Sequence, residues 1–101
     1  MLKRRRFHDL IERQLAVFGA DEAPLLAEAD EADAAWTNAS AEESEELYGD
    51  YQLVVDAIGE RLYEVRETYA SSLEEHAAED YRAAFNANAK KRFGRLAAFL
   101  E

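Results

Sequence analysis

Three groups of acidic and histidine side chains have spacings that could support metal-ion or acid–base chemistry. They are Glu60 with Glu64 and Glu67, His76 with Glu79 and Asp80, and His8 with Glu12. Metal sites in helical bundles use inward-facing carboxylates with Glu-x-x-His spacing, but Leu73 stands three residues before His76. The motif is incomplete, so an ordinary hydrated surface is favoured over a ferritin-like metal site for these carboxylates. His8 and Glu12 are interpreted as a flank of the core in preference to a ligand pair.

Other catalytic signatures are missing from the sequence. The chain has no cysteine, which excludes disulfides and thiolate metal sites. Gly49 and Gly59 are isolated and do not form a phosphate-binding loop. Neither histidine lies beside a serine, threonine or tyrosine with a recognisable third orienting group. Nothing in the sequence indicates a cofactor or supports an enzyme.

The first half of the chain predicts two helices. One spans residues 3–18 and would end at Gly19, and Asp21 would cap the next, with Pro24 tolerated in its first turn. The apolar positions of the first helix are Phe7, Leu10, Ile11, Leu15 and Phe18. Those of the second form a narrow, alanine-rich stripe: Leu25, Ala29, Ala32 and Trp36. Such a stripe allows close helix approach but buries little surface per turn.

The stretch from 47 to 69 predicts the strongest amphipathic helix. Its apolar residues recur at alternating spacings of four and three: Tyr51, Val55, Ile58, Leu62, Val65 and Tyr69. Residues 37–40 form a cluster whose side chains compete with the backbone hydrogen bonds of a helix. Ser40 with Glu43 also matches a capping box, so we expect a break before this helix. The alternative is one continuous helix from about residue 22 to 70.

A last helix is predicted from about residue 72, with Ser71 and Glu74 as a second capping box. Beyond residues 86–88 its apolar stripe rotates, so the last turns should kink or pack against something different. Short connections favour antiparallel neighbours. The prediction is a single all-α domain over residues 1–101, an antiparallel bundle of four helices, or three if the second and third are continuous.

The net charge of −10 is unevenly distributed. Residues 1–13 carry a net +3, residues 14–81 a net −17 and residues 82–101 a net +4. In an up-down-up-down bundle both basic ends would lie beside the acidic start of the third helix. Basic side chains at the start of a helix oppose its dipole, so Arg4, Arg5 and Arg6 are candidates for contact with a polyanion. The acidic middle argues against an extended nucleic-acid surface.

The alanine-rich second helix offers little bulk to cover the 51–69 stripe. We therefore expect a second copy to complete the core as a homodimer, with a possible further protein partner. Tyr63 lies on the shoulder of the stripe next to Gly59, where an aromatic ring can anchor a partner. The interface candidates are Tyr48, Tyr63, Phe93 and Leu96.

These observations favour a small, acidic, non-enzymatic interaction or assembly module. The alternatives are a carboxylate-rich metal-binding bundle and a weak polyanion or nucleic-acid binder acting through the basic termini. The basic start resembles that of a signal peptide, but Asp9, Glu12 and Arg13 interrupt the apolar stretch that should follow. No apolar run approaches membrane-spanning length, so we expect a cytoplasmic protein without a membrane partner.

Overall fold

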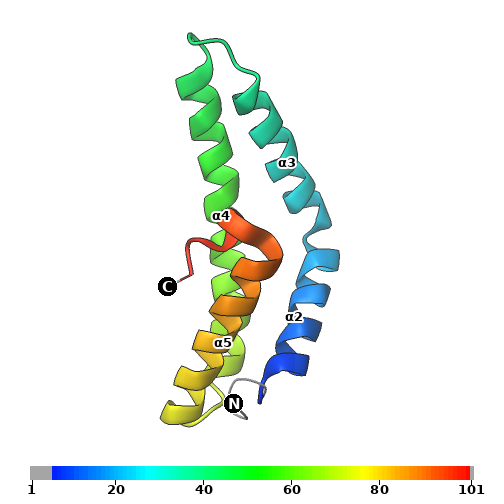
Figure 1. The fold of residues 1–101 in the computed structure, drawn as a ribbon, viewed down its shortest axis with the longest axis vertical. Helices are drawn as coiled ribbons and strands as arrows, with labels where there is room; N and C mark the ends of the chain where they lie inside the picture. Colours follow the sequence, from blue (N-terminus) through cyan, green and yellow to red (C-terminus); the bar gives the residue numbers. More distant parts are fainter. Residues whose placement is uncertain (1–5, 101) are drawn as a thin grey trace.

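The computed structural model of the chain describes residues 6–100. Within this range it contains four α-helices, a short 3₁₀ helix and no β-strand, which confirms the all-α class. The helices are α2 (His8–Asp21), α3 (Ala23–Thr37), α4 (Ser44–Ala70) and α5 (Glu75–Phe93), and the 3₁₀ helix is η1 (Gly94–Ala97). The described part is elongated, with extents of 50 × 23 × 22 Å (Figure 1).

The boundary between α2 and α3 differs from the prediction. Helix α2 continues through Gly19 to Asp21, and Glu22, not Asp21, is the residue between the two helices. The backbone keeps its helical hydrogen bonds here, because the Glu22 N–H donates to the Phe18 carbonyl (2.8 Å) and the Leu26 N–H to the Glu22 carbonyl (2.9 Å). A glycine inside a helix weakens it by about 1 kcal/mol but does not have to end it. Pro24 lies in the first turn of α3 as predicted.

This one-residue break changes the path of the chain. Reversing the direction of the chain between two helices takes a connection of about two to five residues. The connection here is the single residue Glu22, so α3 continues along the same side of the molecule as α2 (Figure 1). Helix α4 returns antiparallel to both, and α5 runs antiparallel to the second half of α4. The expected up-down-up-down path is therefore wrong. The α3–α4 connection lies at the far end of the molecule, away from the basic residues 90–95.

The predicted break before α4 is confirmed, so α3 and α4 are separate helices. The Glu43 N–H donates to Ser40 Oγ (3.3 Å), and Ser40 Oγ donates to Glu43 Oε1 (3.2 Å), as expected for residues of a capping box.

The start of α5 uses a different cap from the predicted one. Glu74 itself is the N-cap, and its carboxylate accepts from the N–H groups of His76 (3.0 Å) and Ala77 (2.6 Å). The bond from Ala77 is the main reason that the pKa of Glu74 lies below its usual value. The Ser71 and Ser72 hydroxyls instead donate to carbonyls in the last turn of α4.

The chain turns sharply after α5, at Gly94, whereas the helix continues without a break through residues 86–88, beyond which the apolar stripe rotates. Gly94 has a φ of +60°, a conformation that side chains other than glycine rarely adopt, and it directs η1 back onto α4. The following residues reach Gly59 of α4, where a Cβ atom would lie 2.8 Å from Phe99 Cβ. The absence of a side chain at Gly59 therefore makes room for this chain's own Phe99.

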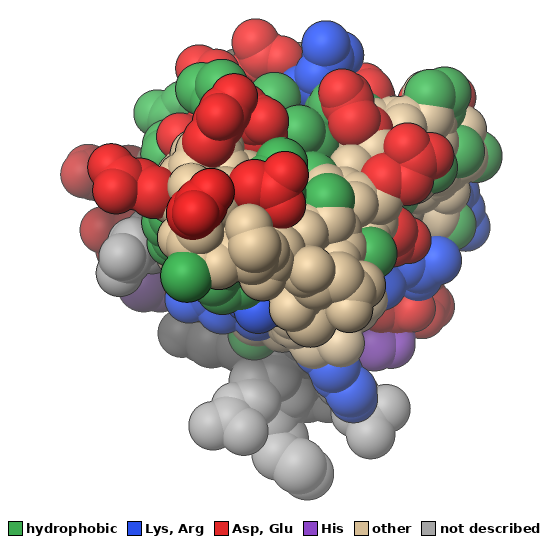
Figure 2. Space-filling model, turned by 90° about the horizontal axis from the view of Figure 1, so that it is seen from above, with side chains coloured by type: hydrophobic (Ala, Val, Ile, Leu, Met, Phe, Trp, Pro, Cys, Tyr) green, Lys and Arg blue, Asp and Glu red, His purple; other side chains and the backbone are tan. Residues whose placement is uncertain are grey.

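Two regions of different thickness result (Figure 1). The three-helix body consists of α2, α5 and the part of α4 from Ile58 onward. The acidic arm, residues 23–57, is a two-helix hairpin of α3 and the first part of α4. It contains ten acidic and no basic side chains, and seen from its tip, acidic side chains gather over this end (Figure 2).

Candidate helix-binding grooves

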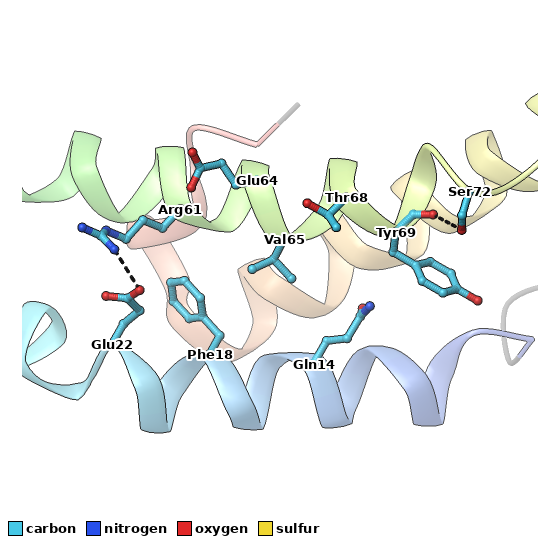
Figure 3. A pocket seen from close by; sticks show the side chains of 9 residues that line it. All are labelled: Gln14, Phe18, Glu22, Arg61, Glu64, Val65, Thr68, Tyr69 and Ser72. Carbon is cyan, nitrogen blue, oxygen red and sulfur yellow. Dashed lines mark hydrogen bonds and ion pairs between the residues drawn. The ribbon is translucent and has the colours of Figure 1, made fainter.

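The body groove lies between α2 and α4, which both pack on α5. It encloses about 500 Å³ and is open on one side (Figure 3). Its lining residues come from both walls: Gln14, Phe18 and Glu22 of α2, Arg61, Glu64, Val65, Thr68 and Tyr69 of α4, and the adjoining Ser72. Most of its exposed surface is apolar, with polar groups along the rims.

The floor of the body groove is continuous with the core. Phe18 is buried and meets Phe93 edge to face, with ring centroids 5.6 Å apart. Val65 and Tyr69, two members of the predicted α4 stripe, are only half-buried in the groove. One end is bridged by Arg61, which donates to Glu22 at 3.1 Å. This exposed ion pair contributes roughly 0–1 kcal/mol to stability.

Tyr81 lies behind the groove and is fully buried. Its hydroxyl donates to Gln14 Oε1 at 2.8 Å, and its ring is 4.8 Å from that of Tyr69. Burial raises the pKa of Tyr81 to about 12, so the phenol stays protonated at neutral pH. The groove lining thus combines apolar surface with hydrogen-bonding groups.

The arm groove lies higher on α4 and encloses about 400 Å³. It is lined by Trp36 of α3, by Tyr48, Tyr51, Gln52, Val55 and Asp56 of α4, and by Arg95, Ala98 and Phe99 near the C-terminus. Trp36 stacks on Tyr51 (5.9 Å between centroids, 13° between planes) and is tilted against Tyr48 (4.9 Å). These three rings hold the two helices of the arm together.

Arg95 closes the lower end of the arm groove. Its guanidinium lies 5.4 Å from the centre of the Tyr51 ring and donates to Asp33 Oδ1 at 2.8 Å. One cation of this chain is therefore held by an aromatic face and a carboxylate of the arm.

A buried arginine links α4 to α5. Arg66 is only 6% exposed and donates to Glu67 (2.8 Å) and to Asn86 of α5 (2.9 Å). Arg82 of α5 donates two further bonds to the Glu67 carboxylate, both 2.9 Å. These bonds, first from Arg82 and then from Arg66, hold the pKa of Glu67 below its usual value. The cluster is structural, because it joins two helices of the body.

The four predicted interface residues lie in different places. Tyr48 is 45% exposed in the arm groove, and Tyr63 is 46% exposed with the Arg66 guanidinium 4.9 Å from its ring centre. Phe93 and Leu96 pack partly buried against this chain's own core. Their role in an interface stays a prediction.

The sequence patterns did not predict either groove as a binding surface. A usable signal existed for the arm groove, since Trp36 and Tyr48 are equally far from residue 42 in the α3–α4 connection and so face each other across the hairpin. The contribution of Phe99 depends on the turn at Gly94 and has no comparable signal.

Among the residues that it describes, the structure does not bring the candidate metal ligands together, and polyanion binding by Arg4, Arg5 and Arg6 stays a prediction. Within residues 6–100, no group of three or more histidine and carboxylate side chains is placed to hold a metal ion. Glu12 Oε1 lies 3.8 Å from Arg92 Nη1, and both residues line a cleft of about 350 Å³ together with His8. Arg6 is exposed, with its guanidinium 5.0 Å from the centre of the Phe7 ring, and Arg4 and Arg5 lie outside the described residues.

Comparisons with protein-family models, curated proteins and solved structures found no match to this chain. Among the described residues, no helix combines the length and apolar character needed to cross a bilayer.

Proposed function

We propose that the protein is a non-enzymatic interaction or assembly module of the cytoplasm that self-associates as a homodimer. The body groove carries this proposal, because it leaves Val65 and Tyr69 of the main apolar stripe half-buried beside the buried Phe18. A three-helix body with an open apolar groove offers the position that a fourth helix fills in a complete bundle.

Exposed apolar side chains extend this surface along both walls. Val17 is 53% exposed and lies three residues after Gln14, on the same side of α2. Leu53 is 70% exposed and precedes Glu64 by eleven residues, about three helical turns, so both lie on one side of α4. Large exposed hydrophobic residues around an apolar groove are typical of protein interfaces.

A second copy is the proposed occupant, in an antiparallel arrangement. The arm carries ten acidic and no basic side chains, whereas residues 58–100 carry seven of each. A parallel pair would bring two strongly acidic arms together. An antiparallel pair places each arm beside the electrically balanced part of the other copy, which lowers the repulsion.

The test is the mass in solution across concentration. We expect light scattering to show a rise from 11.5 kDa toward twice that value. Replacing Val17 and Leu53 together by glutamine keeps good helix formers at exposed positions and should shift the protein toward the monomer. Ala83→Gln, on the exposed outer side of α5, is the matched control. A constant mass of 11.5 kDa up to millimolar protein contradicts self-association.

A carboxylate-rich metal-binding bundle is the less well supported alternative. Its candidate residues Glu60, Glu64 and Glu67 are not part of any three-ligand group in the described chain.

A further inference from the structure

The geometry points to a second binding site: the arm groove accepts a basic amphipathic helix of a partner protein. This inference rests on the proposed interaction function and names a partner class for it. It uses a different surface from the proposed homodimer contact, because the two grooves are lined by different residues of α4.

The first argument is the shape of the arm. In the body, the side of α4 that carries Leu62 and Arg66 is covered by α5, to which Arg66 donates a bond at Asn86. Tyr51 and Val55 lie eleven residues earlier, about three turns, and continue that side of α4 into the arm. Helix α5 ends at Phe93, and after the turn at Gly94 the chain packs back on α4 near Gly59, at one end of the arm groove (Figure 1). A helix in the arm groove therefore extends the three-helix arrangement of the body.

The second argument is charge. All ten ionised side chains within residues 23–57 are acidic, and one of them, Asp56, lines the groove itself. Such a field attracts a basic helix and repels a nucleic acid, an acidic helix or the arm of another copy. Charge complementarity thus selects a cationic partner and separates it from the second copy that we propose for the body groove.

The third argument comes from Arg95. Its guanidinium is already held in the groove by the Tyr51 ring (5.4 Å to the centroid) and by Asp33 (2.8 Å). An arginine or lysine of a partner can make the same two kinds of contact with the remaining rings and carboxylates of the arm. Tyr48, 45% exposed, and the half-buried Trp36 supply apolar surface for the other face of an amphipathic helix.

Trp36 is the only tryptophan of the chain and lines the groove, so its fluorescence reports occupancy directly. The probe is a synthetic helical peptide of about 14 leucine and lysine residues, roughly 21 Å long, with leucine along one face. We expect a saturable change in Trp36 emission that weakens between about 0.05 and 0.5 M salt, as for other exposed charge contacts. A scrambled peptide of the same composition should bind at least about tenfold more weakly, because its leucines no longer share a face.

Two variants test whether the peptide binds in the arm groove. Tyr48→Ala keeps the charge of the protein and should weaken binding about tenfold, the effect of losing an aromatic anchor. Gln52→Lys places a positive charge in the groove, where it can pair with Asp56 four residues later, and should weaken binding without harming the helix. Ala83→Gln, on the exposed outer side of α5 and outside both grooves, should leave peptide binding unchanged.

The outcomes separate this inference from the proposed homodimer. Peptide binding that the two groove variants reduce supports the inference, even if the mass stays at 11.5 kDa and the homodimer is lost. A concentration-dependent mass with no saturable emission change overturns the inference alone. Equal binding of the scrambled peptide also overturns it, since the attraction is then non-specific charge. A constant mass together with no peptide binding overturns both proposals.

Discussion

The three-helix body and the acidic arm share helix α4 but are stabilised differently. The largest fully buried side chains of the described residues are Tyr81, Phe85, Ile11, Leu15, Ile58, Leu62 and Leu100, and none of them belongs to the arm. Within the arm only Ala29 and Tyr51 are buried hydrophobic residues. The body is thus held by burial of large apolar side chains, whereas the arm depends on stacked aromatic rings, a capping box and the continuity of α4. Residues that bury little of their own surface are free to contact a partner.

Truncating one α4 side chain in each region should give the largest contrast. Leu62→Ala, at a fully buried position of the body, should lower the free energy of unfolding by about 2–5 kcal/mol because it leaves a cavity. Val55→Ala, at a half-buried position of the arm, should cost less than about 1 kcal/mol because solvent already reaches it. Urea unfolding followed by circular dichroism measures both. Similar losses for the two variants would show that the arm is as well packed as the body.

Alkaline pH should weaken the body through Tyr81. Its pKa is raised from the ordinary tyrosine value of 10.0 to about 12, so the folded state retains a proton that the unfolded state releases. This stabilisation is complete below about pH 10 and is lost as the pH rises through about 12, which corresponds to about 1–3 kcal/mol. Unfolding free energies at about pH 9 and pH 11.5 should therefore differ less for Tyr81→Phe than for the natural chain. An identical pH dependence of the two proteins would contradict this assignment.

Two glycines of α4 provide the smallest and most specific contrast. Gly49, in the arm, has nothing within 4 Å of the position that a Cβ atom would take, so Gly49→Ala should stabilise the protein by up to about 1 kcal/mol through helix propensity. At Gly59, next to the arm groove, an added Cβ atom would lie 2.8 Å from Phe99 Cβ, so Gly59→Ala should displace the C-terminal residues and lower the free energy of unfolding by about 1 kcal/mol. Thermal unfolding of the pair tests the sign. A higher melting temperature for both variants would mean that the contact between Gly59 and Phe99 does not matter for stability.

Local sequence signals predicted most of the helices but not their path. The alternating spacing from Tyr51 to Tyr69 identified α4, and Ser40 with Glu43 identified the break before it. Gly19 and Pro24 marked the region of the α2–α3 boundary, yet such residues do not define the angle between two helices. That angle follows from the single intervening residue Glu22 and from packing against α4, which periodicity cannot report.

The grooves were less predictable than the helices, for a related reason. An apolar stripe shows which side of a helix is buried. It does not show where along the helix the neighbouring elements that cover this side come to an end. The half-burial of Val65 depends on how α2 and α5 are spaced around α4. The contact of Phe99 with Gly59 joins residues forty positions apart and follows from the turn at Gly94. Likewise, serines and glutamates lie close together in the sequence at the start of α5. Only the backbone geometry shows that Glu74 is the residue that caps the helix.

Helix α4 runs without interruption for 27 residues, through the body and into the arm. At about 1.5 Å per residue it spans roughly 40 Å, most of the molecule's length. The one-residue joint at Glu22 therefore cannot act as a free hinge, because any swing of α3 has to bend α4 as well. Helix α4 thus acts as a rigid support that fixes the distance between the tip of the acidic arm and the far end of the three-helix body.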